Sequence, residues 1–239
     1  MVKALLFDLD GTLLPVDTDE FISSYLELLS SKLEKWMEAR EFIKKLMEST
    51  YAMINNLDPL RTNKDVFWEE FCLKISHKKE ELAPIFDEFY ERDFPRLARL
   101  VPKNPIPNRI LKAAHEKGYE LVIATNPIFP ESAILERLRW IDALEFPYKL
   151  ITTYENMHFA KPQIEYYAEI LEKIGKDPGE CLMIGNDAEE DMVAGKMGIK
   201  TYLVTDHMLN RNNIDFKADY TGTLENLLDF VNNLEEVRL

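Results

Sequence analysis

The chain has 239 residues, of which 46% are hydrophobic and 30% are charged, and its formal net charge is −14. This balance is typical of a globular protein with a sizeable core, and the acidic surface disfavours nucleic acid as a partner, because a phosphate backbone is also negative. No apolar stretch approaches the ~20 residues that span a bilayer, so we expect no membrane partner. The two cysteines lie far apart within apolar patterns, which is expected for reduced thiols in a cytoplasmic protein.

The chain begins with a continuous apolar run over residues 3–8, which is typical of a strand buried on both faces. Residues 16–105 contain no such run. They repeat apolar residues at helical spacing instead, which predicts a bundle of about four helices. Within this zone Asn63, which precedes Lys64 and Asp65, is expected to be a helix N-cap.

After residue 105 the pattern changes to strands that alternate with helices, which predicts a parallel sheet covered on both faces. The strand at 3–8 belongs with this sheet. Residues 1–15 and 106–239 are therefore predicted to form a doubly wound, Rossmann-like α/β core, with residues 16–105 inserted as a helical cap. The remaining strands are expected at 121–124, 150–151, 181–184 and 201–204, and the core helices at about 108–117, 130–138, 163–174, 188–197 and 223–234.

Polar residues at the end of the first strand are the first candidates for a site, because open parallel sheets bind ligands at the carboxyl ends of their strands. Asp8 and Asp10 are two residues apart, so we expect both carboxylates to face one point. A divalent cation would relieve their repulsion, and ligation by oxygen alone favours Mg²⁺. An ordinary Asp-x-Asp-Gly turn is the alternative, whereas a calcium-binding loop fails because its sixth position, Leu13, is not glycine.

Further polar residues follow the later strands. Thr125 and Asn126 come after the strand at 121–124, where a hydroxyl beside free backbone N–H groups can hold a phosphate oxygen. Lys161 precedes a helix N-terminus, where a cation is unfavourable unless an anion lies between the two; a solvated lysine is the alternative. Acidic residues then follow the strand at 181–184, and of these Glu189 and Glu190 are expected only to complement a helix dipole.

In combination these segments resemble the haloacid dehalogenase-like (HAD) superfamily of hydrolases over nearly the whole chain. The family's first motif resembles Phe7 to Leu13, its second Thr125, its third Lys161 followed by proline, and its fourth Gly185 to Asp191. The insertion after the first strand resembles the helical cap of the family's first cap class, C1. The fourth motif departs from the usual Gly-Asp pattern, because Asn186 follows the glycine and the acid comes one place later.

The resemblance implies a Mg²⁺-dependent phosphatase that hydrolyses a small phosphorylated metabolite through an aspartyl-phosphate intermediate. Asp8 would attack phosphorus, and Asp10 would protonate the leaving oxygen. A dehalogenase lacks an acid at that place, because a halide leaves without a proton. Lys161, Thr125 and Asn126 would hold the remaining phosphate oxygens.

The resemblance also implies a set of metal ligands. Asp8 and the backbone carbonyl of Asp10 would bind the ion together with Asp187, and Asp191 would act directly or through another ligand. The alternative is that Asn186, and not Asp187, is the direct metal ligand.

Two other functions remain open. One is a phosphomutase of the phosphoglucomutase type, and the other is a phospho-accepting signalling module, although such modules resemble bare domains of about half this length without a cap. The cap is expected to select the substrate and exclude water. Tyr25, Arg61 and Asn63 are candidates for reaching the site from the cap, but each fits a surface or core position better.

Overall fold

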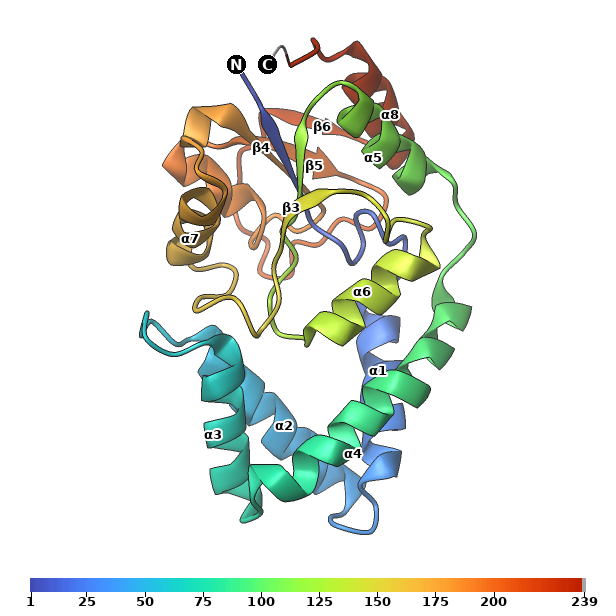
Figure 1. Ribbon diagram of the computed structural model, residues 1–239, viewed down its shortest axis with the longest axis vertical. Coiled ribbons are helices and arrows are strands. Elements are labelled where there is room, and N and C mark those ends of the chain that lie inside the picture. The colour runs from blue at the N-terminus through green and yellow to red at the C-terminus, as the bar shows by residue number, and fades with distance from the viewer. Residues whose placement is uncertain (238–239) are drawn as a thin grey trace.

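A computed structural model describes residues 1–237, so the last two residues of the expected 106–239 core segment lie outside it. Figure 1 shows a sheet with helices on both faces and a group of helices at one end, and both termini lie at the opposite end. The sheet has six parallel strands in the order β3-β2-β1-β4-β5-β6. They are β1 (Ala4–Phe7), β2 (Glu120–Ile123), β3 (Tyr148–Ile151), β4 (Cys181–Gly185), β5 (Lys200–Val204) and β6 (Tyr220–Gly222).

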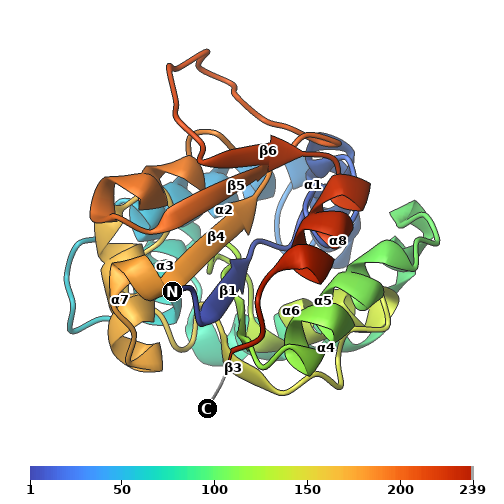
Figure 2. The same cartoon turned by 90° about the horizontal axis from the view of Figure 1, so that it is seen from above.

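The central strand β1 is fully buried because helices cover both of its faces. Leu5 and Phe7 belong to one hydrophobic cluster, and Ala4 and Leu6 belong to a second cluster on the other face. The first face is covered by α5 (Ile106–Glu116), α6 (Glu131–Trp140) and α8 (Leu224–Asn233), and the second by α7 (Ile164–Ile174) (Figure 2). The doubly wound parallel sheet predicted from the sequence is therefore confirmed.

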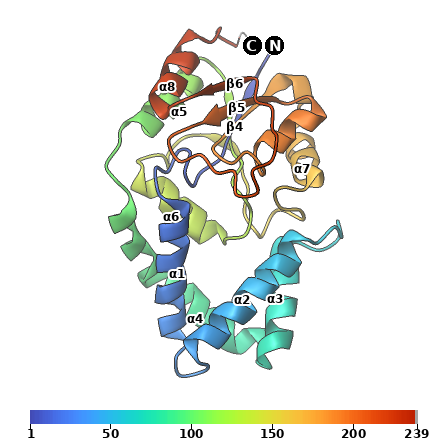
Figure 3. The same ribbon diagram turned by 180° about the vertical axis from the view of Figure 1, so that it is seen from behind.

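Four α-helices and a 3-10 segment lie between β1 and α5, as the helical periodicity predicted. They are α1 (Thr18–Lys32), α2 (Ala39–Ile54), α3 (Asn63–Ile75), α4 (Lys79–Arg92) and the 3-10 helix Phe94–Leu100. All four α-helices lie at the same end of the molecule, beyond α6 (Figures 1 and 3). Aromatic rings hold them together: the Phe71 ring centroid is 5.9 Å from that of Phe42 and 5.8 Å from that of Phe86.

Two local predictions are wrong. Thr62, not Asn63, caps α3, because the Thr62 side chain accepts a hydrogen bond from the backbone N–H of Asp65. Asn63 is fully buried in the first turn of the helix, and its amide donates to the carbonyl oxygens of Pro127 and Phe159, at 3.2 Å each. The helix expected at 188–197 is only a short 3-10 helix, Met192–Met197, because the preceding residues form a loop.

Within residues 1–237, no helix has both the length and the apolar character that crossing a membrane requires.

Candidate active site

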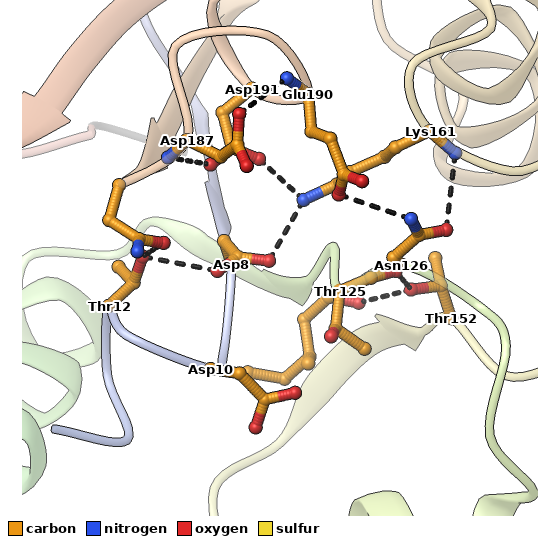
Figure 4. A network of polar contacts seen from close by, with 12 residues as sticks. Asp8, Asp10, Thr12, Thr125, Asn126, Thr152, Lys161, Asp187, Glu190 and Asp191 are labelled. Carbon is orange, nitrogen blue, oxygen red and sulfur yellow. Dashed lines mark hydrogen bonds and ion pairs between the residues drawn. The ribbon is translucent and has the colours of Figure 1, made fainter. Parts of the chain in front are cut away.

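A cavity of about 160 Å³ opens at the carboxyl ends of β1, β2 and β4, where α1 approaches the sheet. Every predicted site residue except Lys161 lines it, and Lys161 reaches the same group from behind. Figure 4 shows the side chains of Asp8, Lys161 and Asp191 turned toward one another from separate segments of the chain, whereas the Asp10 carboxylate points away from them. The lining residues that the sequence identified are Asp8, Asp10, Thr125, Asn126, Asp187 and Asp191.

Asp8 lies at the centre of this cluster, held by donors on both carboxylate oxygens. Lys161 Nζ donates to Asp8 Oδ1 at 2.9 Å, and the Thr12 hydroxyl donates to Oδ2 at 3.1 Å (Figure 4). The Asp8 side chain is 11% exposed and faces the cavity. A carboxylate fixed in this way is pre-organised to act as a nucleophile, since its orientation costs nothing at the moment of reaction.

Lys161 is buried between two carboxylates, so the solvated-lysine alternative is wrong. Its side chain is 1% exposed, and Nζ also lies 2.5 Å from Asp191 Oδ1. Burial alone would lower the pKa of Lys161, but the charges of Asp191 and Asp8 outweigh burial and raise the pKa well above its ordinary value. Lys161 therefore keeps its positive charge next to the nucleophile.

Asp191 uses both of its oxygens within the protein. Oδ1 accepts from Lys161, and Oδ2 accepts from the backbone N–H of Asp187 at 2.9 Å. Gly185 makes room for this carboxylate, because a Cβ at that position would overlap the Asp191 side chain. The glycine that ends β4 is thus required by close packing.

Asn186 and Asp187, the two residues at issue in the fourth motif, face the cavity in different ways. Asn186 Oδ1 accepts from the Thr12 hydroxyl at 3.0 Å, so its side chain lies beside Asp8. Asp187 Oδ1 accepts from the backbone N–H groups of Glu189 and Glu190, at 2.8 and 3.0 Å. Its other oxygen lies 3.5 Å from an Arg211 nitrogen.

The Asp10 carboxylate forms an ion pair with Arg137 on α6, which the sequence reasoning missed. Arg137 is fully buried, and its guanidinium carbon lies 4.5 Å from the centroid of the Phe129 ring. Burial raises the pKa of the Asp10 carboxyl, although the Arg137 charge opposes this. The sequence contains a sign that Arg137 is buried, because its position falls on the same helix face as the apolar residues Ala133, Ile134 and Leu138.

Hydrogen bonds to neighbouring segments hold the loop after β2 in place. The Thr125 carbonyl oxygen accepts from the hydroxyls of Thr152 and Tyr166, at 2.7 and 2.9 Å. Asn126 bridges two segments: its Oδ1 accepts from the Lys161 backbone N–H at 3.3 Å, and its Nδ2 donates to Glu190 at 3.1 Å.

Glu190 also lines the cavity, so the expectation that it serves only a helix dipole is wrong. Burial, reinforced by the charges of Asp187 and Asp8, raises the pKa of Glu190 to about 7. Burial likewise raises the pKa of Asp191 to about 7. Burial is the largest cause of both shifts, and the Lys161 charge opposes it. Five carboxylates line the cavity, from Asp8, Asp10, Asp187, Glu190 and Asp191.

The raised pKa of Glu190 predicts a pH dependence of stability. Between about pH 4.5 and 7 the folded protein holds a proton on Glu190 that the unfolded chain releases, so the free energy of unfolding falls as pH rises through this range. The Glu190→Gln variant lacks this titration, and its stability relative to wild type is expected to increase from pH 4.5 to 7.5 by roughly 1–3 kcal/mol. Urea unfolding at several pH values without added metal measures this difference; a constant difference would contradict the assignment.

The donor set of the cavity fits a hard divalent cation. Among residues 1–237, no three His, Cys, Asp or Glu side chains are grouped so that they could hold a metal by themselves. Mg²⁺ does not require such a cage, because it keeps several waters and typically uses one or two carboxylates together with phosphate oxygens. The five carboxylates that line the cavity outnumber the basic groups paired with them, which are Lys161, Arg137 and Arg211, so a bound cation would offset part of the remaining negative charge.

Comparisons with known proteins agree with this fold. The profile of the haloacid dehalogenase-like hydrolases matches residues 2–198. The pyrophosphatase PpaX of Bacillus velezensis is 24% identical over 202 residues, which is 84% of this chain and 82% of that protein. Two solved structures share the fold. A HAD phosphatase from Thermococcus onnurineus has a TM-score of 0.61 and 22% sequence identity, and the match covers 99% of this chain and 100% of the other. The L-2-haloacid dehalogenase of Xanthobacter autotrophicus has a TM-score of 0.59 and 15% sequence identity, and the match covers 98% of this chain and 100% of the other.

Proposed function

The chain belongs to the haloacid dehalogenase-like hydrolases, and we propose that it is a Mg²⁺-dependent phosphatase that hydrolyses a small phosphorylated metabolite through a phosphorylated Asp8. The observation that carries the proposal is the Asp8 carboxylate, held by Lys161 and Thr12 at the base of a cavity that Thr125 also lines. The name of the PpaX relative, a pyrophosphatase, supports phosphoryl chemistry.

In the proposed first step, Asp8 Oδ attacks phosphorus and the bond to the ester oxygen breaks. Lys161 offsets the repulsion between the nucleophile and the phosphate, and Thr125 and Asn126 hold the other phosphate oxygens. Asp10 gives a proton to the leaving oxygen. Burial raises the pKa of the Asp10 carboxyl, which favours the protonated form that this role needs, while the charge of Arg137 opposes it.

In the second step, water attacks the phosphorus of the aspartyl phosphate, the bond to Asp8 breaks, and Asp10 takes the proton from that water. The need for an acid also separates this proposal from dehalogenation, in which the leaving halide takes no proton. The similarity to the Xanthobacter dehalogenase therefore supports the fold and not its reaction.

We propose that the metal is held by Asp8, the Asp10 carbonyl oxygen and Asp187. A bound Mg²⁺ would supply charge that offsets the repulsion between the carboxylates and the phosphate. Because both Asp191 oxygens are engaged, Asp191 would act through Lys161 and through the backbone of Asp187. Residues 16–105 would act as the cap.

Release of phosphate from p-nitrophenyl phosphate, measured with and without Mg²⁺, tests the proposed function. We expect turnover that EDTA abolishes and Mg²⁺ restores. No turnover with Mg²⁺, Mn²⁺ or Co²⁺ across a panel of phosphate esters would reject it.

The metal assignment gives a separate prediction. Asp187→Ala removes a charged oxygen ligand, so the Mg²⁺ concentration that gives half-maximal activity is expected to rise at least tenfold. Asn186→Ala removes a neutral amide that contacts Thr12, and a smaller rise is expected. Titrating both variants with Mg²⁺ decides the question: a larger rise for Asn186→Ala would move the ligand position to Asn186.

A further inference from the structure

A second cavity, of about 360 Å³, lies between the helices of residues 16–105 and the cavity lined by Asp8, which we call the catalytic cavity. It is bounded by α1, α2, α3 and α4, by Tyr154, and by the loop after β2. The two cavities share five lining residues, so the second is continuous with the place where the phosphate is proposed to bind. The shared residues are Ile22, Ile128, Phe129, Glu190 and Arg211.

The lining of this second cavity is almost entirely apolar. Of its 18 residues, eight are aromatic, seven are aliphatic, and only Thr50, Glu190 and Arg211 are not. Three of the five hydroxyls in the lining are already engaged: Tyr25 and Tyr90 bond each other at 2.9 Å, and Thr50 donates to the carbonyl oxygen of Leu46. The other two belong to Tyr51 and Tyr154. A hydroxyl-rich group would lose its hydrogen bonds to water here and gain few in return.

The charge of the lining also disfavours a second phosphate group. Arg211 is the only basic residue in the lining, and its guanidinium already lies 2.9 Å from Asp19 and 3.5 Å from Asp187. Glu190, at the junction of the two cavities, adds a carboxyl on the same side. A pyrophosphate or sugar bisphosphate would therefore meet, in this lining, one arginine that is already paired with carboxylates and no second cation.

We propose that the second cavity binds the leaving group of the substrate, and that this group is hydrophobic and contains at least one ring. The inference rests on the proposed function, since it assigns the part of the phosphate ester that extends away from Asp8. A large apolar cavity with few polar groups is the usual form of a site for a hydrophobic ring system, and stacked or edge-on contacts with aromatic side chains add to the area that is buried.

Three synthetic esters test the proposal directly: ethyl phosphate, benzyl phosphate and 2-naphthylmethyl phosphate. In all three the leaving oxygen belongs to a primary alcohol, so differences in rate report the contacts of the group and not its chemistry. We expect kcat/KM to rise along the series by roughly 30-fold or more from ethyl to 2-naphthylmethyl, because each buried carbon adds apolar contact. Inorganic pyrophosphate is expected to be a poorer substrate than the naphthyl ester.

A variant that fills the cavity, with a matched control, locates the effect. Thr50→Phe adds a ring to the lining of the cavity from α2, and the naphthyl-to-ethyl ratio of kcat/KM is expected to fall below about five. Lys44 lies on the same helix with a 75% exposed side chain, and Lys44→Phe is expected to leave the ratio and both rates unchanged.

Binding of ethylphosphonate and 2-naphthylmethylphosphonate, measured by calorimetry with Mg²⁺ present, separates this inference from the proposed function. If the esters are hydrolysed at equal rates, or pyrophosphate is the best substrate, the cavity assignment is wrong and the phosphatase stands. If none of the esters is hydrolysed but the naphthyl phosphonate binds at least tenfold more tightly, the phosphatase is wrong and the cavity assignment is supported. Equal binding of the two phosphonates would overturn the cavity assignment.

Discussion

Replacing Asp8 with asparagine is expected to lower the rate of phosphate release by at least about 10⁴-fold, because an amide is a poor nucleophile and no aspartyl phosphate can form. The fold should be retained, since asparagine keeps the shape of the side chain: its oxygen can still accept from Lys161, and its NH2 group can donate to the Thr12 hydroxyl oxygen. Steady-state hydrolysis of p-nitrophenyl phosphate with Mg²⁺, together with circular dichroism, measures both properties.

Asp17→Asn is the matched control for this experiment. The same chemical change is made at the N-cap of α1, outside the catalytic cavity, where asparagine caps a helix as well as aspartate does. We expect a rate within about twofold of the wild type. If Asp8→Asn turned over at a rate similar to this control, Asp8 would not be the nucleophile.

Replacing Lys161 with methionine is expected to affect both activity and stability. The rate should fall by roughly 10²–10³-fold, because a cation that stabilises the transferring phosphoryl group is lost. Asp8 and Asp191 would also remain buried without their counter-ion, which costs about 3–5 kcal/mol of unfolding free energy. The stability loss should be larger at pH 8 than at pH 5.5, because Asp191, whose pKa is about 7 in the wild type, takes up a proton at the lower pH.

The double variant Lys161→Met/Asp191→Asn separates the two effects. The amide oxygen introduced by Asp191→Asn can still accept from the backbone N–H of Asp187, while one of the two unpaired charges is removed. We expect urea unfolding at pH 8 to show that more than half of the lost stability is recovered, with no recovery of activity. A Lys161→Met variant as stable as the wild type at pH 8 would contradict the role assigned to this lysine.

Most of the strands that the sequence predicted are buried on both faces of the sheet. The strand at β1 reads as an unbroken apolar run because no residue from Ala4 to Phe7 contacts water. The short strand β6 was missed for the opposite reason: it lies at the edge of the sheet, and Tyr220 and Thr221 are exposed, so no apolar run marks it. The helix expected at 188–197 forms only as the 3-10 helix Met192–Met197, although the Asp187 side chain accepts from the backbone amides of Glu189 and Glu190 as a helix N-cap would.

Most of the predicted site follows the strand rule, and Lys161, which was identified from its place before a helix, is the exception. Asp8, Thr125 and Asp187 each follow a strand, and the parallel order of the sheet brings such residues to one edge. Arg137 and Glu190 reach the cavity from a helix and from a loop, where spacing along the sequence does not indicate direction. Of the cap candidates, Tyr25 lines the second cavity, whereas Arg61 pairs with Glu69 at the surface and Asn63 is structural.

The buried Asn63 has a mechanical consequence. Besides the two bonds of its amide, its backbone N–H donates to Met157 and that of Lys64 donates to Tyr154, both at 2.8 Å. Four hydrogen bonds thus tie the first turn of α3 to the segments that follow β2 and β3, and at about 0.5–1.5 kcal/mol each they make its detachment costly. We therefore expect the start of α3 to stay attached to the sheet domain, so that any widening of the second cavity would have to come from the helices α1, α2 and α4.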